Sequence, residues 1–187
     1  MDQLVFQHLQ NHIETTMILG ENCSDKISEA AEKVTQALLS GQSIFSCGIA
    51  ENAPLSQLFV HYLSSGYHIE RPGFPAIDLG CLTGMNFADQ SLSNSLHIHS
   101  QNGDILVVFS SGNNNPQLKN TIDAAVEKGL LVLLLSATDD NLLAEKLGTQ
   151  DIEISCAEFS DQSVSAVYFL IIQCLCTLID NKIFGGS

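Results

Sequence analysis

Apolar residues recur at helical spacing from the start of the chain and predict two consecutive helices. The first carries an apolar stripe over residues 4–18, and His8 and His12 lie four apart on that same face. Ser24 or Asp25 is a suitable N-cap for the second helix, which carries its own apolar stripe up to Gly41.

Short apolar runs after this point predict buried strands that alternate with helices. The clearest unit is a strand over Asp104–Phe109, a polar turn, a helix over Leu118–Lys128 and a strand over Leu130–Ser136. Continuous apolar strands joined by a helix are typical of a parallel sheet covered on both faces, so the sequence predicts a doubly wound α/β sandwich. Further strands are expected at Ser43–Cys47, Ala76–Leu79 and Asp151–Ser155, and further helices at Asn52–Ser64, Asn141–Lys146 and Ser163–Asn181.

The 187 residues suit one domain, and we expect residues 1–40 to pack in an oligomer against an α/β core of residues 41–187. Hydrophobic residues make up 45% of the chain, which is enough for a core. The net charge of −14 repels phosphate backbones, so we expect no direct contact with nucleic acid. The apolar run over Val164–Ile179 is interrupted by polar residues, so we expect a buried helix and no membrane span.

The six cysteines form no C-x-x-C pair, and we expect buried thiols in a reducing cytoplasm. His8 and His12 have a spacing that chelates zinc, but no third ligand or HExxH glutamate accompanies them. Ordinary helix residues are therefore favoured over a zinc site. We expect no cofactor and no metal.

Two strand-to-helix junctions are candidates for binding an anion. The first, Cys47–Ala53, carries one glycine and the acid Glu51, which would oppose a phosphate. The second, Ser110–Pro116, reads SSGNNNP and offers hydroxyls, amides and a helix start. Turns of serine, glycine and asparagine are common in any fold, so residue types alone favour a plain turn here.

The order of these features resembles the SIS (sugar isomerase) domain family, in particular the phosphoheptose isomerases and the DnaA initiator-associating (DiaA) proteins. Three segments carry the resemblance: Glu70–Ile77 (ERPGFPAI), Gly103–Ser111 and Cys174–Asn181 (CLCTLIDN). The resemblance spans nearly the whole chain. It implies a five-stranded parallel sheet in a three-layer α/β/α sandwich, a homotetramer, and sites for phosphorylated sugars between subunits.

Several positions depart from the family's pattern. The first phosphate loop of the family reads C-G-N-G-x-S-A, but Ile49, Ala50 and Asn52 stand here in place of its asparagine, second glycine and serine. In the second loop, Asn113 and Asn115 replace glycine and serine. The phosphosugar-binding residues that the resemblance implies, in what could be a vestigial site, are Asn52, Ser110, Ser111 and Asn115.

The catalytic groups of the isomerases are also missing from the matching positions. Their glutamate on the helix after the first loop falls at His61–Tyr62, and their metal-binding helix histidine aligns with Leu58. Their Q-E-x-H group on the closing helix aligns with Ser165, Ala166 and Tyr168. Aldose–ketose isomerisation needs both a base and an acid, so we expect no catalytic residues here.

Ile183 and Phe184 follow the expected end of the closing helix, and DiaA-like proteins end in a similar D-N-x-[LI]-F. They could dock on the chain's own core or serve as exposed anchors for a partner. The sequence therefore favours a non-catalytic, cytoplasmic, homotetrameric adaptor that binds several molecules of the replication initiator DnaA and promotes initiation. The alternatives are a phosphoheptose-isomerase-like enzyme acting on sedoheptulose 7-phosphate and a sugar-phosphate sensor.

Overall fold

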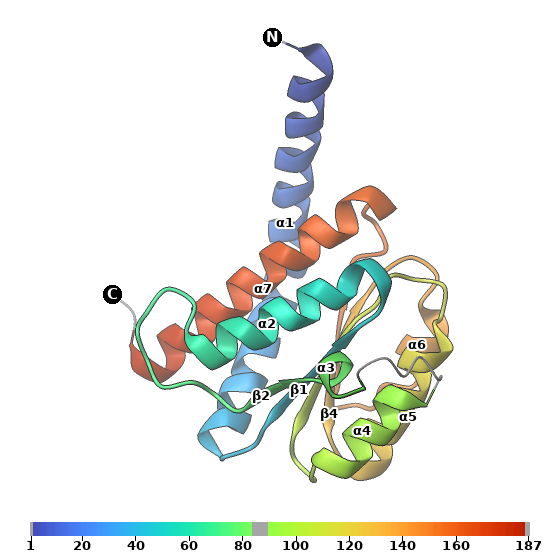
Figure 1. The fold of residues 1–187 in the computed structure, drawn as a ribbon. Helices are drawn as coiled ribbons and strands as arrows, with labels where there is room; N and C mark the ends of the chain where they lie inside the picture. The colour runs from blue at the N-terminus through green and yellow to red at the C-terminus, as the bar shows by residue number, and fades with distance from the viewer. Residues whose placement is uncertain (1, 84–89, 186–187) are drawn as a thin grey trace.

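The computed structural model describes residues 2–83 and 90–185, and it has a five-stranded parallel sheet between two layers of helices (Figure 1). The strands lie in the order β2-β1-β3-β4-β5. Their bounds are β1 Ile44–Gly48, β2 Ala76–Asp78, β3 Ile105–Phe109, β4 Leu131–Ser136 and β5 Ile152–Ser155. The α/β sandwich and the parallel sheet that the sequence predicted are confirmed.

One layer of helices consists of α1 (Gln3–Leu39), α2 (Ala53–Ser65) and α7 (Asp161–Phe184). They pack on the sheet face formed by alternate strand residues such as Ile105 and Val107. The opposite face, with Leu106 and Val108, is covered by a second layer. That layer contains α3 (Leu79–Thr83), α4 (Ser91–His99), α5 (Pro116–Lys128) and α6 (Asn141–Ala144).

The N-terminal region is one continuous helix of 37 residues, so the prediction of two helices was wrong. Ser24 does not cap a new helix, because its hydroxyl donates to the carbonyl of Gly20 one turn earlier. The burial of α1 begins at Leu19, and the preceding part of the helix projects from the body of the molecule (Figure 1). Its exposed apolar side chains are Leu4, Val5, Phe6, Leu9, Ile13, Met17 and Ile18.

The closing helix was also predicted too short. It continues past Asn181 through Ile183 and Phe184 to a left-handed glycine, Gly185, with φ of 71°. By length and composition α7 could span a membrane, but half of its apolar window is buried inside the fold. It packs against α1 and α2, as expected of a core helix.

The topology creates a switch point between β1 and β3. The helix that follows β1 lies on one face of the sheet, and the helix that follows β3 lies on the other. In open α/β sheets, ligands bind in the crevice at the carboxyl ends of two such strands. The junctions singled out in the sequence lie at these two strand ends.

Candidate functional site

The first junction is a tight turn that depends on Gly48 at the end of β1. A Cβ atom placed there would lie 2.3 Å from the backbone oxygen of Asn52, so a larger residue does not fit. Residues Ala50–Asn52 form a single 3₁₀ turn before α2. Glu51 is exposed in this turn.

Asn52 closes the crevice by reaching across from the first junction to the second. Its side-chain Nδ2 donates to the backbone oxygen of Ser110 at 3.0 Å, and its Oδ1 accepts from the hydroxyl of Ser165 at 3.3 Å. Both Asn52 and Ser110 are buried. The structure therefore brings the predicted residues of the two loops together, but with the side chain of Asn52 hydrogen-bonded inside the protein.

Tyr168 on α7 donates to the same carbonyl. Its hydroxyl lies 2.8 Å from the oxygen of Ser110 and 2.9 Å from the oxygen of Leu135 on β4. The ring is fully buried and packs edge-on against Phe109. Burial raises the pKa of the Tyr168 hydroxyl far above its usual range, so this group stays protonated as a donor.

Ser165 and Tyr168 stand at positions that the resemblance matches to the isomerases' catalytic group. Here a hydroxyl and a phenol fix the loops to one another. A protonated phenol with so high a pKa and a serine hydroxyl are poor proton acceptors at neutral pH. This part of the site is suited to holding two strand ends in place.

The second junction is also occupied by its own side chains. Asn115 caps α5: its Oδ1 accepts from the backbone N–H groups of Gln117 at 2.9 Å and Leu118 at 3.4 Å. These are the donors that a bound phosphate would use. Ser110 is buried and its Oγ accepts from the N–H of Gly112, while Ser111 is half-buried at the start of the turn.

A buried acid lies beneath the same turn. The carboxylate of Asp140 accepts from the N–H of Asn114 at 3.4 Å and from the N–H of Ala137 at 2.8 Å. Its negative charge and the capping side chain of Asn115 both compete with an anion. Weak binding of a sugar phosphate at Ser110, Ser111 and Asn115 stays a prediction.

A buried polar chain that sequence reasoning missed lies at the neighbouring strand. The hydroxyls of Ser46 on β1 and Ser56 on α2 are 2.8 Å apart, and Ser56 donates to the carboxylate of Asp78. Asp78 also accepts from the N–H of Cys81 at 2.8 Å. Burial, with Asp78 nearby, raises the pKa of the Cys47 thiol, so Cys47 is a structural thiol as expected. The expectation of buried thiols was wrong for Cys81 and Cys174, which are exposed.

Two of the segments that carried the resemblance meet in an ion pair. Arg71 from the ERPGFPAI segment donates through Nε to Asp180 of the CLCTLIDN segment at 2.6 Å, with side chains 1% and 8% exposed. Its other guanidinium nitrogens donate to the carbonyls of Leu63, Tyr62 and Pro72. The pair fixes the loop before β2 to the end of α7.

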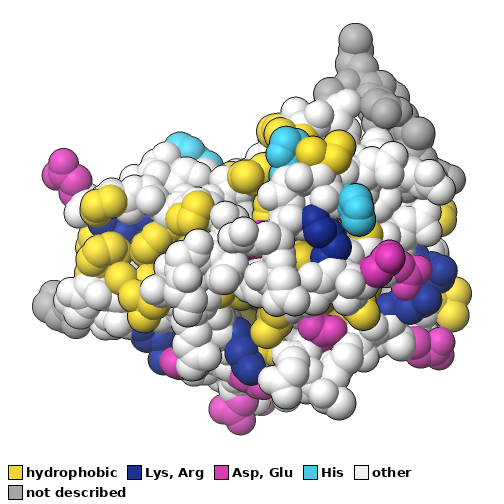
Figure 2. Space-filling view, turned by 90° about the horizontal axis from the view of Figure 1, so that it is seen from below, with side chains coloured by type: hydrophobic (Ala, Val, Ile, Leu, Met, Phe, Trp, Pro, Cys, Tyr) yellow, Lys and Arg dark blue, Asp and Glu magenta, His cyan; other side chains and the backbone are white. Residues whose placement is uncertain are grey.

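The end of α7 forms an apolar surface next to this ion pair. Phe184 is 45% exposed and stacks on Phe74, with ring centroids 6.0 Å apart, and Arg71 lies 4.0 Å from the centroid of the Phe74 ring. Ile183 is half-buried and packs against the core. Figure 2 shows apolar side chains gathered on the side where Figure 1 places the end of α7 and the loop between α2 and β2.

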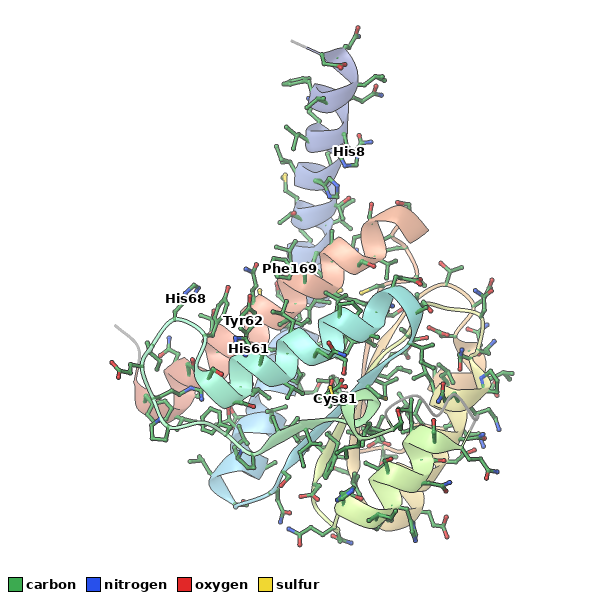
Figure 3. All side chains as sticks on the ribbon, in the orientation of Figure 1. His8, His61, Tyr62, His68, Cys81 and Phe169 are labelled. Carbon is green, nitrogen blue, oxygen red and sulfur yellow. The ribbon has the colours of Figure 1, made fainter. Side chains whose placement is uncertain are left out.

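The positions matched to the isomerases' glutamate lie on α2 beside α7. Figure 3 shows His61 and Tyr62 on α2 and Phe169 on the neighbouring α7. His61 is exposed, whereas Tyr62 packs against Tyr67, with ring centroids 4.6 Å apart. Across residues 2–83 and 90–185, no three histidine, cysteine, aspartate or glutamate side chains come together as a metal site.

Known proteins of two kinds are similar to this chain, although no family model matches it. It is 31% identical over 179 residues to the DnaA initiator-associating protein DiaA of Cronobacter sakazakii, covering 92% of this chain and 91% of that protein. It is 32% identical to the phosphoheptose isomerase of Shewanella frigidimarina, with the same coverage. In structure it is similar to a phosphoheptose isomerase from Francisella tularensis, with a TM-score of 0.88, 22% identity, and coverage of 97% of this chain and 100% of that one.

Proposed function

The chain belongs to the SIS domain family, in the group of DiaA and the phosphoheptose isomerases, and we propose that within it the protein is a non-catalytic adaptor for the replication initiator DnaA. Relatives of both names are similar to the chain to nearly the same degree. Overall similarity therefore does not separate an adaptor from an enzyme, and the choice depends on the site.

The observation that carries the proposal is the pair of hydrogen bonds to Ser110. Asn52 and Tyr168 both donate to its backbone oxygen across the switch point. An isomerase needs open space there for its substrate, and a base beside it. In this chain the space is spanned by Asn52, and Tyr168 stands where the resemblance places a catalytic histidine.

Partner binding is proposed at the end of α7, through Phe184 with a smaller contribution from Ile183. Phe184 has an exposed ring face and is held in position by Phe74, so it is a preorganised apolar anchor. The acidic surface fits a role in which DnaA makes the contact to DNA. We further propose a cytoplasmic homotetramer, in which four such surfaces hold several initiator molecules with avidity.

Binding to purified DnaA, measured by surface plasmon resonance, tests the adaptor proposal. We expect Phe184→Ala to weaken binding by about 2 kcal/mol while the melting temperature stays within 2–4 °C of that of the wild type. Ile98→Ala is the matched control, because Ile98 is an exposed apolar residue on the remote helix α4. Unchanged affinity of the Phe184 variant would remove this surface from the proposal.

Turnover of sedoheptulose 7-phosphate tests the enzymatic alternative. We expect no product above that formed by a heat-inactivated sample. Clear turnover would overturn the non-catalytic proposal. Loss of that turnover in the Tyr168→Phe variant would further assign chemistry to the residue that we describe as a tether.

A further inference from the structure

We propose that His8 and His12 form a two-ligand site for a divalent transition metal ion, with zinc as the expected occupant. Both residues lie on the projecting part of α1, and Figure 3 shows His8 there, away from the switch point. Their Nε2 atoms share a hydrogen bond at 3.1 Å, and the rings meet edge to face with centroids 4.6 Å apart. A bound ion would take the place of this hydrogen bond, with each ring keeping its proton on Nδ1. The site does not rest on the DnaA-binding surface proposed at the end of α7.

The distance between the two nitrogens suits a shared ion. Zinc bonds imidazole nitrogen at about 2.0–2.1 Å, so two nitrogens on one tetrahedral zinc lie about 3.3 Å apart. The pair is within a few tenths of an ångström of that spacing without any change of the backbone. Side chains four apart on a helix face the same way, so the helix supplies this arrangement before any ion binds.

The surroundings of the pair leave room for an ion and its water ligands. A cavity of about 220 Å³ lies between α1 and the start of α7, and His8 and His12 line it together with Asn11, Glu14, Thr15, Ile18, Ser160 and Ser163. The serine, threonine and asparagine side chains can hydrogen-bond water on the metal, as outer partners do in metal sites. The net charge of −14 also favours a cation over an anion at the surface.

A bound ion would cross-link two successive turns of α1. Because the described residues hold no cluster of three ligands, the remaining coordination positions belong to water or to histidines of a second copy. An ion that bonds His8 and His12 links two successive turns near the N-terminus of α1. Metal binding should therefore stabilise this exposed part of the helix against local opening.

Calorimetric titration of the untagged full-length chain with zinc chloride tests the proposal. We expect saturable binding of one ion per chain, or one per two chains if a second copy completes the site. Each of His8→Ala and His12→Ala should weaken binding at least about tenfold, since even outer partners of metal ligands matter by about 10–100-fold. Zinc should also slow hydrogen exchange of the backbone amides over residues 8–16.

A matched variant separates chelation from the number of histidines. In His12→Ala combined with Gln10→His, the chain keeps six histidines, but the two on α1 point about 200° apart. It should lose zinc binding, whereas His97→Ala on α4 should keep it. Equal zinc affinity in the wild type and in the rearranged variant, or no binding at millimolar zinc, would overturn the proposal.

Discussion

The backbone oxygen of Ser110 is the single atom on which the site converges. It accepts from Asn52, the residue before α2, and from Tyr168 on α7, so both helices are linked to the residue that follows β3. All three residues are buried, and a donor left without an acceptor there would be costly. Asn52, Ser110 and Tyr168 thus contribute hydrogen bonds that stabilise the fold at the place where an isomerase would have its substrate pocket.

Tyr168→Phe tests this tether. The substitution removes a hydroxyl that lies close to two carbonyls and leaves the ring in place, so the free energy of unfolding should fall by about 1–3 kcal/mol. Tyr62→Phe is the control, because Tyr62 is only half-buried, and it should change little. Urea unfolding at one protein concentration measures both, and equal stability of the two variants would contradict the tether.

Part of this site was predictable from the sequence. The two junctions were located because strand ends followed by helices mark ligand crevices in α/β sheets, and the family resemblance singled out Asn52, Ser110, Ser111 and Asn115 within them. The sequence did not show that Asn52 faces inward or that Asn115 caps its own helix. The inward orientation of Asn52 depends on hydrogen bonds with Ser110 and Ser165, which lie 58 and 113 residues further along the chain.

Among the elements, the loop between α2 and β2 depends most on a charged contact. Arg71 and Asp180 form a buried pair, and the remaining donors of Arg71 are used by backbone carbonyls. Since the two residues come from two motifs that carried the family resemblance, the motifs are explained by a structural contact. Sequence alone could not pair them, because 108 residues separate them along the chain.

Arg71→Ala should therefore destabilise the protein strongly. Removing one partner of a buried ion pair leaves the other charge uncompensated, which costs about 3–5 kcal/mol. Lys26→Ala is the matched control, because Lys26 pairs with Glu29 on the surface of α1 and should cost less than about 1 kcal/mol. Thermal melting measures both variants, and similar melting temperatures for Arg71→Ala and Lys26→Ala would contradict the buried ion pair.

The ends of the strands were easier to predict from the sequence than the ends of the long helices. The strands and the helix α5 were located within one or two residues, since apolar runs and capping residues mark them. The break expected at Ser24 did not occur, because a serine hydroxyl can bond within a helix as well as cap one. The end of α7 was placed too early because Asp180–Lys182 is polar, although Asp180 faces the buried Arg71.

On the scale of the whole molecule, a buried phenol and several buried thiols should make the folded state less stable at high pH. Burial raises the pKa of Tyr168 and of the thiols of Cys47 and Cys156, and raises that of Cys176 to about 12. In an unfolded chain, cysteine thiols and tyrosine phenols have pKa values of about 8.5 and 10. Above these values the unfolded chain binds fewer protons than the folded one, so stability is lost as pH rises.

Urea unfolding at pH 8 and pH 10 should show this loss. Each buried group can contribute up to about 1.4 kcal/mol per pH unit once its unfolded form has titrated. Tyr168→Phe should flatten the decline between pH 10 and pH 11, because the phenol no longer takes part. Identical midpoints at pH 8 and pH 10 would show that these groups do not differ between the folded and unfolded states.

The exposed apolar face on the projecting part of α1 favours self-association of the protein. Leu9, Ile13 and Met17 form an exposed apolar face there, and a helix half that covers no core gains little from folding alone. Burying this face against other copies would stabilise the helix and assemble the proposed tetramer. We therefore expect light scattering to give about four times 20.2 kDa for the wild type.

Charge placed on this face should break the assembly without unfolding the core. In Leu9→Glu combined with Ile13→Glu, two carboxylates would have to be buried without partners, which an interface does not tolerate. Gln7→Glu combined with Asn11→Glu adds the same charge on the opposite side of the helix and should remain tetrameric. A Leu9/Ile13 variant that keeps the mass of the wild type would show that α1 projects for another reason, since its apolar stripe would then contribute nothing to association.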